Sequence, residues 1–503
     1  EDIDLSIVGR AEVIKGPSSS LYGAGLGGTI LLQPSRHVEP GTWMSGNAMA
    51  GSFGLLRSAG RYTTSNTQNY TESSYNYTRS DGFRENNNYE RYGFTALREI
   101  YGEKTSLSLL TNFIHAKAFI PSSIDSNTFV NNPRAAAPTW LKTKGYEQYN
   151  RFFFGASLRY SFWGRWQGVS STYAGFRNNY EPRPFNILRE ASYWVGSRTR
   201  IDWRGKLAGR PFAWAGGYEL YQEWYDWQTY ENISGLGERG LVVGDNEEIR
   251  DYINFFTHAE WKPFARTLLV LGLNANRTDY LYSDYYAADT IDRSGNYRFS
   301  DQWSPRIAVS QGLTADISAF ASVSQGFSPP TLSETLTPDG VINPNIRPET
   351  GWNYEAGLRG VLKKRFFFET TLYHMDVRNL LVAERTADDQ FVGRNAGRTR
   401  HDGAEFFAEY RAGSDKSLNI ILFTSYHYAR YRFLEFTDRD KNYAGNALTG
   451  VPAHSFSSGV DVSSRIGFFG NLQAMYVSEI PMLDDNSKYA DAYFLLHAQA
   501  GYG

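Results

Sequence analysis

The sequence predicts an all-β protein, built as one large antiparallel β-barrel that spans a membrane. Apolar and polar residues alternate along most of the chain after residue 41, and long connections alternate with short ones between the alternating segments. The composition agrees, because 16% of the 503 residues are aromatic, and membrane barrels concentrate aromatic rings where their strands meet the membrane surface.

The alternation is clearest in the stretch NRFFFGASLRYSF. Every second residue from Phe152 to Phe162 is apolar, whereas the positions between them are largely polar or small. The same pattern recurs at residues 316–324, 352–360 and 404–411. Because successive side chains of a strand point to opposite faces, each strand has one apolar face, which we expect to contact lipid, and one polar face, which we expect to line the barrel interior.

The connections alternate between two kinds. Long, polar connections are predicted within hairpins, at residues 81–90, 120–148, 180–197, 228–250, 280–299, 328–349, 381–394, 433–451 and 479–491. Short connections are predicted between hairpins, at residues 101–104, 163–166, 210–211, 262–267, 314–316, 361–365, 412–416 and 463–469. This rhythm gives about 20 strands, with long loops at one end and tight turns at the other, as is typical of outer-membrane barrels.

Other classes of protein fit the sequence less well. A soluble propeller would repeat a motif about every 40–50 residues, and no such repeat is seen. No run of apolar residues is long enough for a transmembrane helix. The net charge of −2 gives no basic footprint for nucleic acid, and the absence of cysteine excludes disulfides and thiol chemistry. No catalytic, cofactor-binding or metal-binding spacing stands out, so we expect neither an enzyme nor a cofactor.

The first residues differ from the rest of the chain. The stretch VGRAEVIKGPSSSLYGAGLGGTILLQP has a short strand, a Gly-Pro break, a small-residue turn and a second strand. A barrel of about 20 strands encloses a wide lumen that is either an open channel or filled by a plug. We therefore expect residues 1–36 to be the last part of a plug domain and residues 41–503 to be the barrel.

The residues that carry a family resemblance lie in this stretch and in two barrel segments. The first set comprises Arg10, Glu12, Val13, Ile14, Gly16, Pro17, Leu21, Tyr22, Gly23, Gly27 and Gly28. The barrel segments are FSPPTLSE followed by NPNIRPETGWNYEAGLRG, within residues 327–360, and NAGRTRHDGAEFFAEY, at 395–410. In these motifs, and across its whole length, the chain resembles TonB-dependent outer-membrane receptors of the siderophore-receptor type.

The resemblance implies a 22-strand barrel with a complete plug. The chain is then expected to lack both ends of the family pattern: the first part of the plug with its TonB-contacting segment, and the last hairpin of the barrel. It also implies which residues form the plug motif, namely Gly16, Pro17, Tyr22, Gly23, Gly27 and Gly28.

The implied function is active import of a ferric siderophore across the outer membrane of a Gram-negative bacterium. The implied partners are the TonB–ExbB–ExbD energy-coupling complex, the ferric siderophore and outer-membrane lipid. Vitamin B12, haem and glycan uptake stay open as alternatives, as does a passive porin-like channel. Haem is less favoured, because the linker TLSETLTPDGVI lacks the histidine that haem receptors carry there.

Two groups of residues are candidate sites. The resemblance implies that plug arginines meet inward-facing barrel carboxylates, which points to a plug–barrel lock of Arg10, Glu355 and Glu405. The alternation independently places both glutamates on inward faces. For substrate binding, arginine suits an anionic chelate and aromatic rings suit flat contact. The alternative is that these residues belong to the aromatic girdle or pack loops. The candidate substrate-binding residues are Arg84, Tyr180, Arg183, Trp227, Tyr282 and Tyr285.

Overall fold

The computed structural model describes residues 7–503 apart from 35, 37–38, 287–291, 336–342, 344–345, 388–389, 396, 414–416 and 439–440. Four predicted loops, 280–299, 328–349, 381–394 and 433–451, therefore lie partly outside the described residues. So do the turn at 412–416 and the first six residues of the predicted plug segment.

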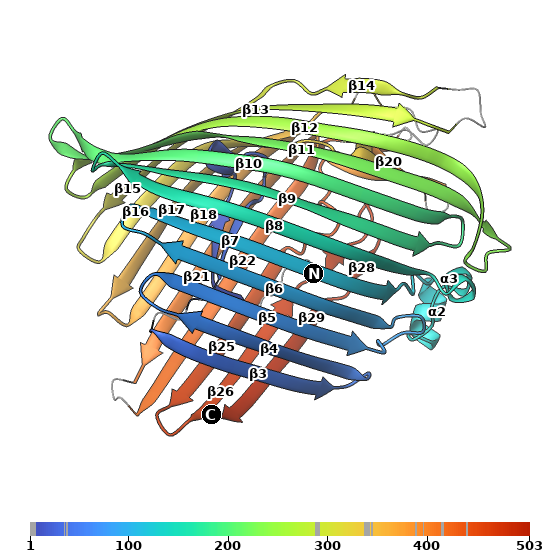
Figure 1. Cartoon of the computed structure of the whole chain (residues 1–503), viewed down its shortest axis with the longest axis horizontal. Helices are drawn as coiled ribbons and strands as arrows, with labels where there is room; N and C mark the ends of the chain where they lie inside the picture. The colour runs from blue at the N-terminus through green and yellow to red at the C-terminus, as the bar shows by residue number, and fades with distance from the viewer. Residues whose placement is uncertain are drawn as a thin grey trace.

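The wall of the barrel is one large antiparallel sheet of about 20 strands, as the sequence predicts (Figure 1). Its strands are β3 (Gly41–Gly51), β4 (Leu55–Ser65), β5 (Asn69–Ser80), β6 (Tyr89–Tyr101), β7 (Thr105–Phe119), β8 (Tyr146–Phe162), β9 (Trp166–Pro182), β10 (Ile187–Leu207), β11 (Arg210–Ile233), β12 (Glu238–Phe264), β13 (Thr267–Asp284), the short β14 (Gly295–Arg298), β15 (Gln302–Gly312), β16 (Ile317–Ser328), β17 (Glu349–Leu362), β18 (Phe366–Arg378), β21 (Arg398–Ala412), β22 (Leu418–Glu435), β25 (His454–Ser464), β26 (Phe468–Val477) and β29 (Tyr493–Tyr502). They follow one another around the barrel in chain order, and β29 lies next to β3 in that order.

The two faces of the wall follow the predicted alternation. In β17, the side chains of Trp352, Tyr354 and Leu358 are exposed on the outer face, whereas Glu355 lines an interior cavity. In β8, Arg151 and Phe153 line an interior pocket and Phe154 is exposed on the outer face. The apolar stripe of each strand therefore points outward, where hydrocarbon can cover it.

Aromatic rings mark the two borders of the lipid-facing band. Near the short turns, the ring centroid of Trp166 lies 6.3 Å from that of Trp203 and 6.3 Å from that of Trp214. Toward the other end of the same strands, Phe176 and Tyr193 are in contact on the outer face. Tryptophan at one border and tyrosine with phenylalanine at the other match the aromatic girdles expected of an outer-membrane barrel.

Strands β9 to β13 extend well beyond this band, and two of the predicted loops are wrong as a result. Residues 180–197 and 228–250 were expected to be long connections, but they are mostly strand, and the connections between β9 and β10 and between β11 and β12 are only four residues long. β12 has 27 residues, whereas about 9–11 cross a bilayer. Because the projecting part has water on both sides, its outer face carries charged residues such as Asp226 and Glu247, and the apolar alternation is lost.

The loop end of the barrel carries the remaining elements. The helices there are α2 (Ser126–Asn131), α3 (Pro138–Thr143) and α4 (Leu332–Thr335). The small strand pairs are β19 (Leu381–Ala387) with β20 (Gln390–Asn395), β23 (Thr437–Asp438) with β24 (Lys441–Asn442), and β27 (Ile480–Pro481) with β28 (Tyr489–Ala490). Asp125 caps α2 by accepting the Thr128 backbone N–H, and this bond lowers the pKa of its carboxyl group. No helix in the described part of the chain has the length and apolar character needed to cross a membrane.

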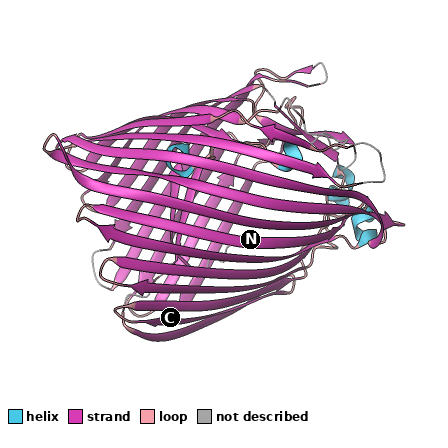
Figure 2. Cartoon of the chain, turned by 45° about the horizontal axis from the view of Figure 1, so that its top comes forward, coloured by secondary structure: helices cyan, strands magenta, loops and turns pink. Residues whose placement is uncertain are grey.

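The segment before the wall lies inside the barrel. It consists of β1 (Val8–Lys15), α1 (Ser19–Tyr22) and β2 (Gly28–Pro34), and β1 and β2 pair as an antiparallel hairpin. Figure 2 shows α1 within the barrel. Arg198 of β10 and Arg306 of β15 donate hydrogen bonds to the carbonyl oxygens of Leu21 and Pro17, at 2.6 and 3.3 Å. We call residues 7–34 the interior segment.

Candidate functional site

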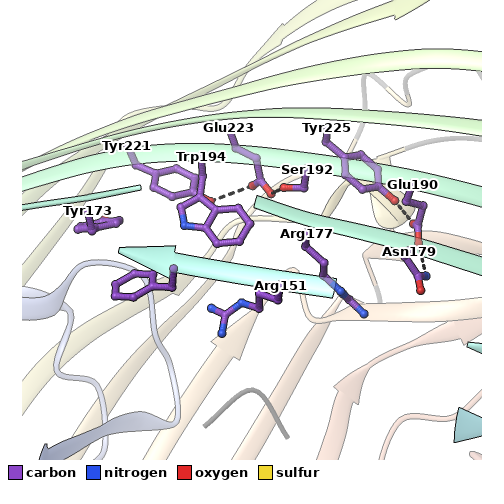
Figure 3. A pocket seen from close by; sticks show the side chains of 11 residues that line it. Arg151, Tyr173, Arg177, Asn179, Glu190, Ser192, Trp194, Tyr221, Glu223 and Tyr225 are labelled. Atoms are coloured by element: carbon purple, nitrogen blue, oxygen red, sulfur yellow. Dashed lines mark hydrogen bonds between the residues drawn. The ribbon is translucent and has the colours of Figure 1, made fainter. Parts of the chain in front are cut away.

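A pocket opens on the inner wall of β8 to β11, in their outer half. Its volume is about 460 Å³, and Figure 3 shows its lining. The lining residues are Arg151, Phe153, Tyr173, Arg177, Asn179, Glu190, Ser192, Trp194, Tyr221, Glu223 and Tyr225. Aromatic rings, two arginines and two glutamates thus share one concave surface, which suits a ligand that offers both flat apolar faces and polar groups.

Glu223 is the polar centre of this pocket. Its carboxylate accepts hydrogen bonds from the Ser192 hydroxyl at 2.6 Å and the Tyr221 hydroxyl at 3.0 Å, and it forms an ion pair with Arg250 (Figure 3 shows the first two). These partners come from β10, β11 and β12. The contacts therefore fix the positions of side chains on three strands before any ligand arrives, which lowers the ordering cost of binding.

Glu190 is the second carboxylate of the pocket. It accepts hydrogen bonds from the Asn179 amide, at 2.7 Å, and from the Tyr225 hydroxyl. Arg177 forms an ion pair with Glu147 at 2.6 Å, and its guanidinium lies over the Tyr149 ring. Because the positive and negative charges of the lining balance, charge alone does not select an anionic ligand at this pocket.

Glu248 lies on β12, beside this network. It is paired across the sheet with Tyr225 and is 4% exposed. Its position is beyond the lipid-facing band, because its neighbour Glu247 and the cross-strand partner Asp226 are charged on the outer face. Burial is the main cause that raises the pKa of Glu248 to about 8; Arg250 opposes this shift and Glu223 adds to it.

Replacing Glu248 by glutamine is expected to stabilise the protein above neutral pH. The pKa of this carboxyl is about 8 in the folded protein and near 4.5 in a solvated chain, so the native state loses stability as pH rises through this interval. At pH 8, Glu248→Gln should raise the apparent melting temperature by about 2–4 °C. The difference should vanish near pH 4, and an equal difference at both pH values would contradict this account of the carboxyl.

Two of the predicted substrate-binding residues lie together on the inner wall. The Trp227 ring centroid is 5.4 Å from that of Tyr225 and 5.7 Å from that of Tyr282. Tyr282 is buried, and its hydroxyl donates to the Asn246 side chain at 2.5 Å. These three rings extend the aromatic lining of the pocket toward the outer end of the barrel, and their role in binding stays a prediction.

The other four predicted substrate-binding residues do not reach this pocket. Arg84 donates to the carbonyl oxygens of Ser122 and Ala135 and so holds the loop between β7 and β8. Arg183 lies 3.8 Å from Glu181 and over the Phe185 ring, in the turn after β9. On the outer face, Tyr180 contacts the Tyr146 ring, and the exposed Tyr285 donates to Glu247.

The sequence already held a signal for the pocket that we missed. Every second residue of the stretch ELYQEWYDW, from Glu219 to Trp227, is a glutamate or an aromatic residue, and these residues face the interior. This stretch lies in the strand predicted between the turn at 210–211 and the loop at 228–250. Applying the alternation to it identifies Tyr221, Glu223 and Tyr225 as residues of one face.

The predicted plug motif makes close contacts with the wall. Gly16 has a φ of 66°, and a Cβ atom there would overlap the carboxylate of Glu355. Gly23 has a φ of 80°, and a Cβ atom would lie 2.8 Å from the Asn254 amide nitrogen. Both positions need glycine for backbone conformation and for space.

The remaining motif residues differ in their surroundings. Pro17 is fully buried, and Tyr22 lies under the Arg198 guanidinium at 5.6 Å. Gly28 has a φ of 126°. Gly27 is not among the positive-φ glycines, and a Cβ atom there would meet nothing within 4 Å.

The structure does not bring Arg10 to either predicted lock partner. Its guanidinium pairs with Glu12 of the same strand at 3.3 Å. Lys15, five residues further along β1, instead forms the ion pair with Glu405. Glu355 accepts hydrogen bonds from Ser322 and Asn353 and lies against Gly16. The inward position of both glutamates agrees with the alternation, but the cation that faces Glu405 is Lys15.

Reversing the charge of Lys15 is expected to loosen this contact. The pair is partly exposed, so its stability contribution is below about 1 kcal/mol, but Lys15→Glu would set two carboxylates against each other. In cells that carry the full-length protein, leak of a large hydrophilic antibiotic should rise severalfold. The double variant Lys15→Glu/Glu405→Lys should restore the seal, whereas Arg10→Glu should not change it. Equal leak in Lys15→Glu and Arg10→Glu would contradict a specific role for Lys15.

Comparison with known proteins agrees with these observations. The family model described as TonB dependent receptor-like, beta-barrel, matches residues 40–503. The Vitamin B12 transporter BtuB of Photobacterium profundum is 24% identical over 244 residues, which cover 45% of this chain and 36% of that protein. The iron-regulated outer membrane virulence protein of Vibrio cholerae is 22% identical over 508 residues, covering 93% of this chain and 69% of that protein. The heme/hemopexin utilization protein C of Haemophilus influenzae is 26% identical over 251 residues, which cover 44% of this chain and 33% of that protein. The chain thus matches only about a third of the length of the first and third of these relatives.

Solved structures show the same fold. The siderophore receptor PiuA from Acinetobacter baumannii is 14% identical, with a TM-score of 0.81 over 99% of this chain and 80% of that chain. The ferric citrate transporter FecA in its unliganded form is 14% identical, with a TM-score of 0.84. The match covers 100% of this chain and 77% of that chain. At this level of identity, the likeness shows the architecture.

Proposed function

Because this chain belongs to the TonB-dependent receptors, whose barrel it forms with residues 40–503, we propose that it imports a ferric siderophore actively across the outer membrane. The family consists of transporters and receptors rather than enzymes, and its members are outer-membrane barrels of Gram-negative bacteria. The energy would come from TonB, driven by ExbB and ExbD in the inner membrane.

In this proposal, residues 1–36 are the last part of the plug and residues 41–503 are the barrel. The position of the interior segment supports it, because the described residues 7–34 contact the inner wall through Lys15, Pro17, Leu21 and Gly25. Among the described residues, the polar contacts are a few hydrogen bonds and a partly exposed ion pair, beside the packing of Pro17 and the contact of Tyr22 with Arg198. Such contacts are weak enough for a mechanical pull to break, which active import requires.

The observation that carries the substrate class is the pocket on β8 to β11. It lies in the outer half of the lumen and offers Trp194, Tyr173 and Tyr221 beside two guanidinium groups. Flat rings suit the aromatic arms of an iron chelate, and the charged side chains of the lining can hydrogen-bond its polar groups. The siderophore receptors among the structural neighbours add support for this class.

Two alternatives remain tied to particular observations. Vitamin B12 and haem uptake are each named for a relative of this chain, although both matches cover less than half of it. Glycan uptake has no comparable support. A passive porin-like channel is disfavoured because the interior segment occupies part of the lumen.

Growth on single iron sources tests the proposal. A strain that lacks the gene should lose growth on one ferric chelate and regain it with the full-length gene. If the strain still uses every ferric chelate and loses only the growth that depends on vitamin B12 or on haem, the siderophore proposal is rejected. In parallel, ferric hydroxamate, catecholate and citrate can be titrated against tryptophan fluorescence, since Trp194 and Trp227 lie at the pocket.

A further inference from the structure

A second group of polar side chains lies on the inner wall of β18, β21 and β22, apart from the pocket on β8 to β11. It consists of Tyr373, Glu405, His427 and Tyr431, which line one interior cavity of about 800 Å³. Among the described residues, no three His, Cys, Asp or Glu side chains gather into a group that could hold a metal ion. This group is of another kind, because two of its four donors are tyrosine oxygens. We call these four residues the tyrosine cluster.

The register of the three strands brings these side chains together. Glu405 of β21 lies directly opposite His427 of β22, so their Cβ atoms are about 5 Å apart. Tyr373 of β18 lies opposite Gly403, and a Cβ atom at this glycine would overlap the Tyr373 ring. Glycine at position 403 therefore leaves the room that the phenol needs to cross β21 and reach β22.

Three donor atoms of the cluster already have the spacing of metal ligands. The Tyr373 oxygen is 2.7 Å from Nε2 of His427 and 2.8 Å from the Tyr431 oxygen. In an octahedral site with bonds of about 2.0–2.1 Å, neighbouring donors are about 2.9 Å apart. Stacking on the His401 ring, at a centroid separation of 4.3 Å, holds the Tyr431 ring in place. The three atoms can therefore share one cation with little rearrangement.

We propose that the tyrosine cluster binds a ferric ion without its chelate. Phenol and carboxylate oxygens are hard donors, which suit a small, highly charged cation, and imidazole is a common ligand of iron. Both phenols ionise on binding, and their two protons pass to water in the cavity. Two phenolates and the Glu405 carboxylate then balance the three positive charges of the ion, while neutral His427 supplies the lone pair of Nε2. This site is separate from the pocket on β8 to β11, so it does not depend on which chelate binds there.

Glu405 links this site to the interior segment. Its carboxylate forms the partly exposed ion pair with Lys15. Because Lys15 and the ferric ion are both cations, they compete for this carboxylate. Lys15→Met should therefore strengthen iron binding severalfold. Arg10→Met, which removes a charge from the same strand at a residue paired with Glu12, should leave iron binding unchanged.

The test compares two variants that each lose two tyrosine hydroxyls. Tyr373→Phe/Tyr431→Phe removes both phenols of the cluster, and Tyr62→Phe/Tyr75→Phe removes two exposed hydroxyls from β4 and β5. Full-length protein in detergent, free of siderophore, is titrated with ferric nitrilotriacetate. The readouts are the iron retained per protein and the visible charge-transfer band that appears only when a phenolate binds Fe³⁺. Radiolabelled nitrilotriacetate shows whether the carrier stays with the iron.

The wild type and Tyr62→Phe/Tyr75→Phe should show the band and retain iron without the carrier. Tyr373→Phe/Tyr431→Phe should lack the band and bind iron at least about tenfold more weakly, whereas His427→Gln should bind more weakly but keep the band. A wild type without the band, or a band of equal strength in Tyr373→Phe/Tyr431→Phe, would overturn the proposal. Iron retained only together with nitrilotriacetate would show a site for chelates and would overturn it as well.

Discussion

Gly16→Val is expected to open the lumen. The residue sits at a φ of 66°, where a β-branched residue is strained by about 1–3 kcal/mol, and its Cβ would overlap the Glu355 carboxylate. The Glu355 and Asn353 side chains can rotate away from the new Cβ, but the backbone strain at this φ remains. We expect the segment to relieve that strain by shifting, which weakens the nearby hydrogen bond from Arg306 to Pro17. In cells with the full-length protein, leak of a large hydrophilic antibiotic should rise about tenfold or more.

Gly27→Val is the matched control for this experiment. Gly27 lies in the same segment, yet a Cβ atom there meets nothing within 4 Å. The Gly27→Val variant should show the same leak as the wild type, and a similar amount of it should be present in the membrane. Equal leak from both variants would mean that valine disturbs the segment without regard to its contacts with the wall.

The second large effect is expected at the pocket. Trp194→Ala removes a ring that lines the pocket and lies under the Arg151 guanidinium at 5.6 Å. Loss of one such aromatic contact should weaken the affinity for the bound ferric chelate by about tenfold. Fluorescence titration is compromised by loss of a tryptophan, so retention of ⁵⁵Fe-labelled chelate on the purified protein is the better measurement.

Trp303→Ala is the control for that loss. Trp303 is 58% exposed on the outer face of β15, away from the pocket, so its removal should leave chelate affinity unchanged. If Trp194→Ala binds as tightly as Trp303→Ala, the pocket on β8 to β11 is not where the chelate binds.

The fold could be predicted from the sequence because lipid imposes a simple rule. Where one face of a strand meets hydrocarbon and the other meets the lumen, the period of two is strict, and the inward positions of Glu355 and Glu405 follow from it. The rule fails where both faces meet water. There the projecting parts of β11 and β12 look like loops, and residues 228–250 were assigned wrongly.

The candidate sites could be predicted only in part. Trp227 was expected from residue type and does face the interior, but Tyr180 is on the outer face, one position from the inward Asn179. Residue type without the alternation could not separate them. The cation facing Glu405 depends on how β1 lies in the lumen, so nothing in the sequence decides between Arg10 and Lys15.

In the proposed import, the interior segment must leave its contacts with the wall. The chain contains no cysteine, so Lys15→Cys and Glu405→Cys can be joined specifically by a short bifunctional maleimide with a cleavable disulfide. Uptake of ⁵⁵Fe-chelate by cells with the full-length protein should stop when the link forms and return when it is cleaved, while each single-cysteine variant transports throughout. Undiminished uptake with the link in place would contradict the claim.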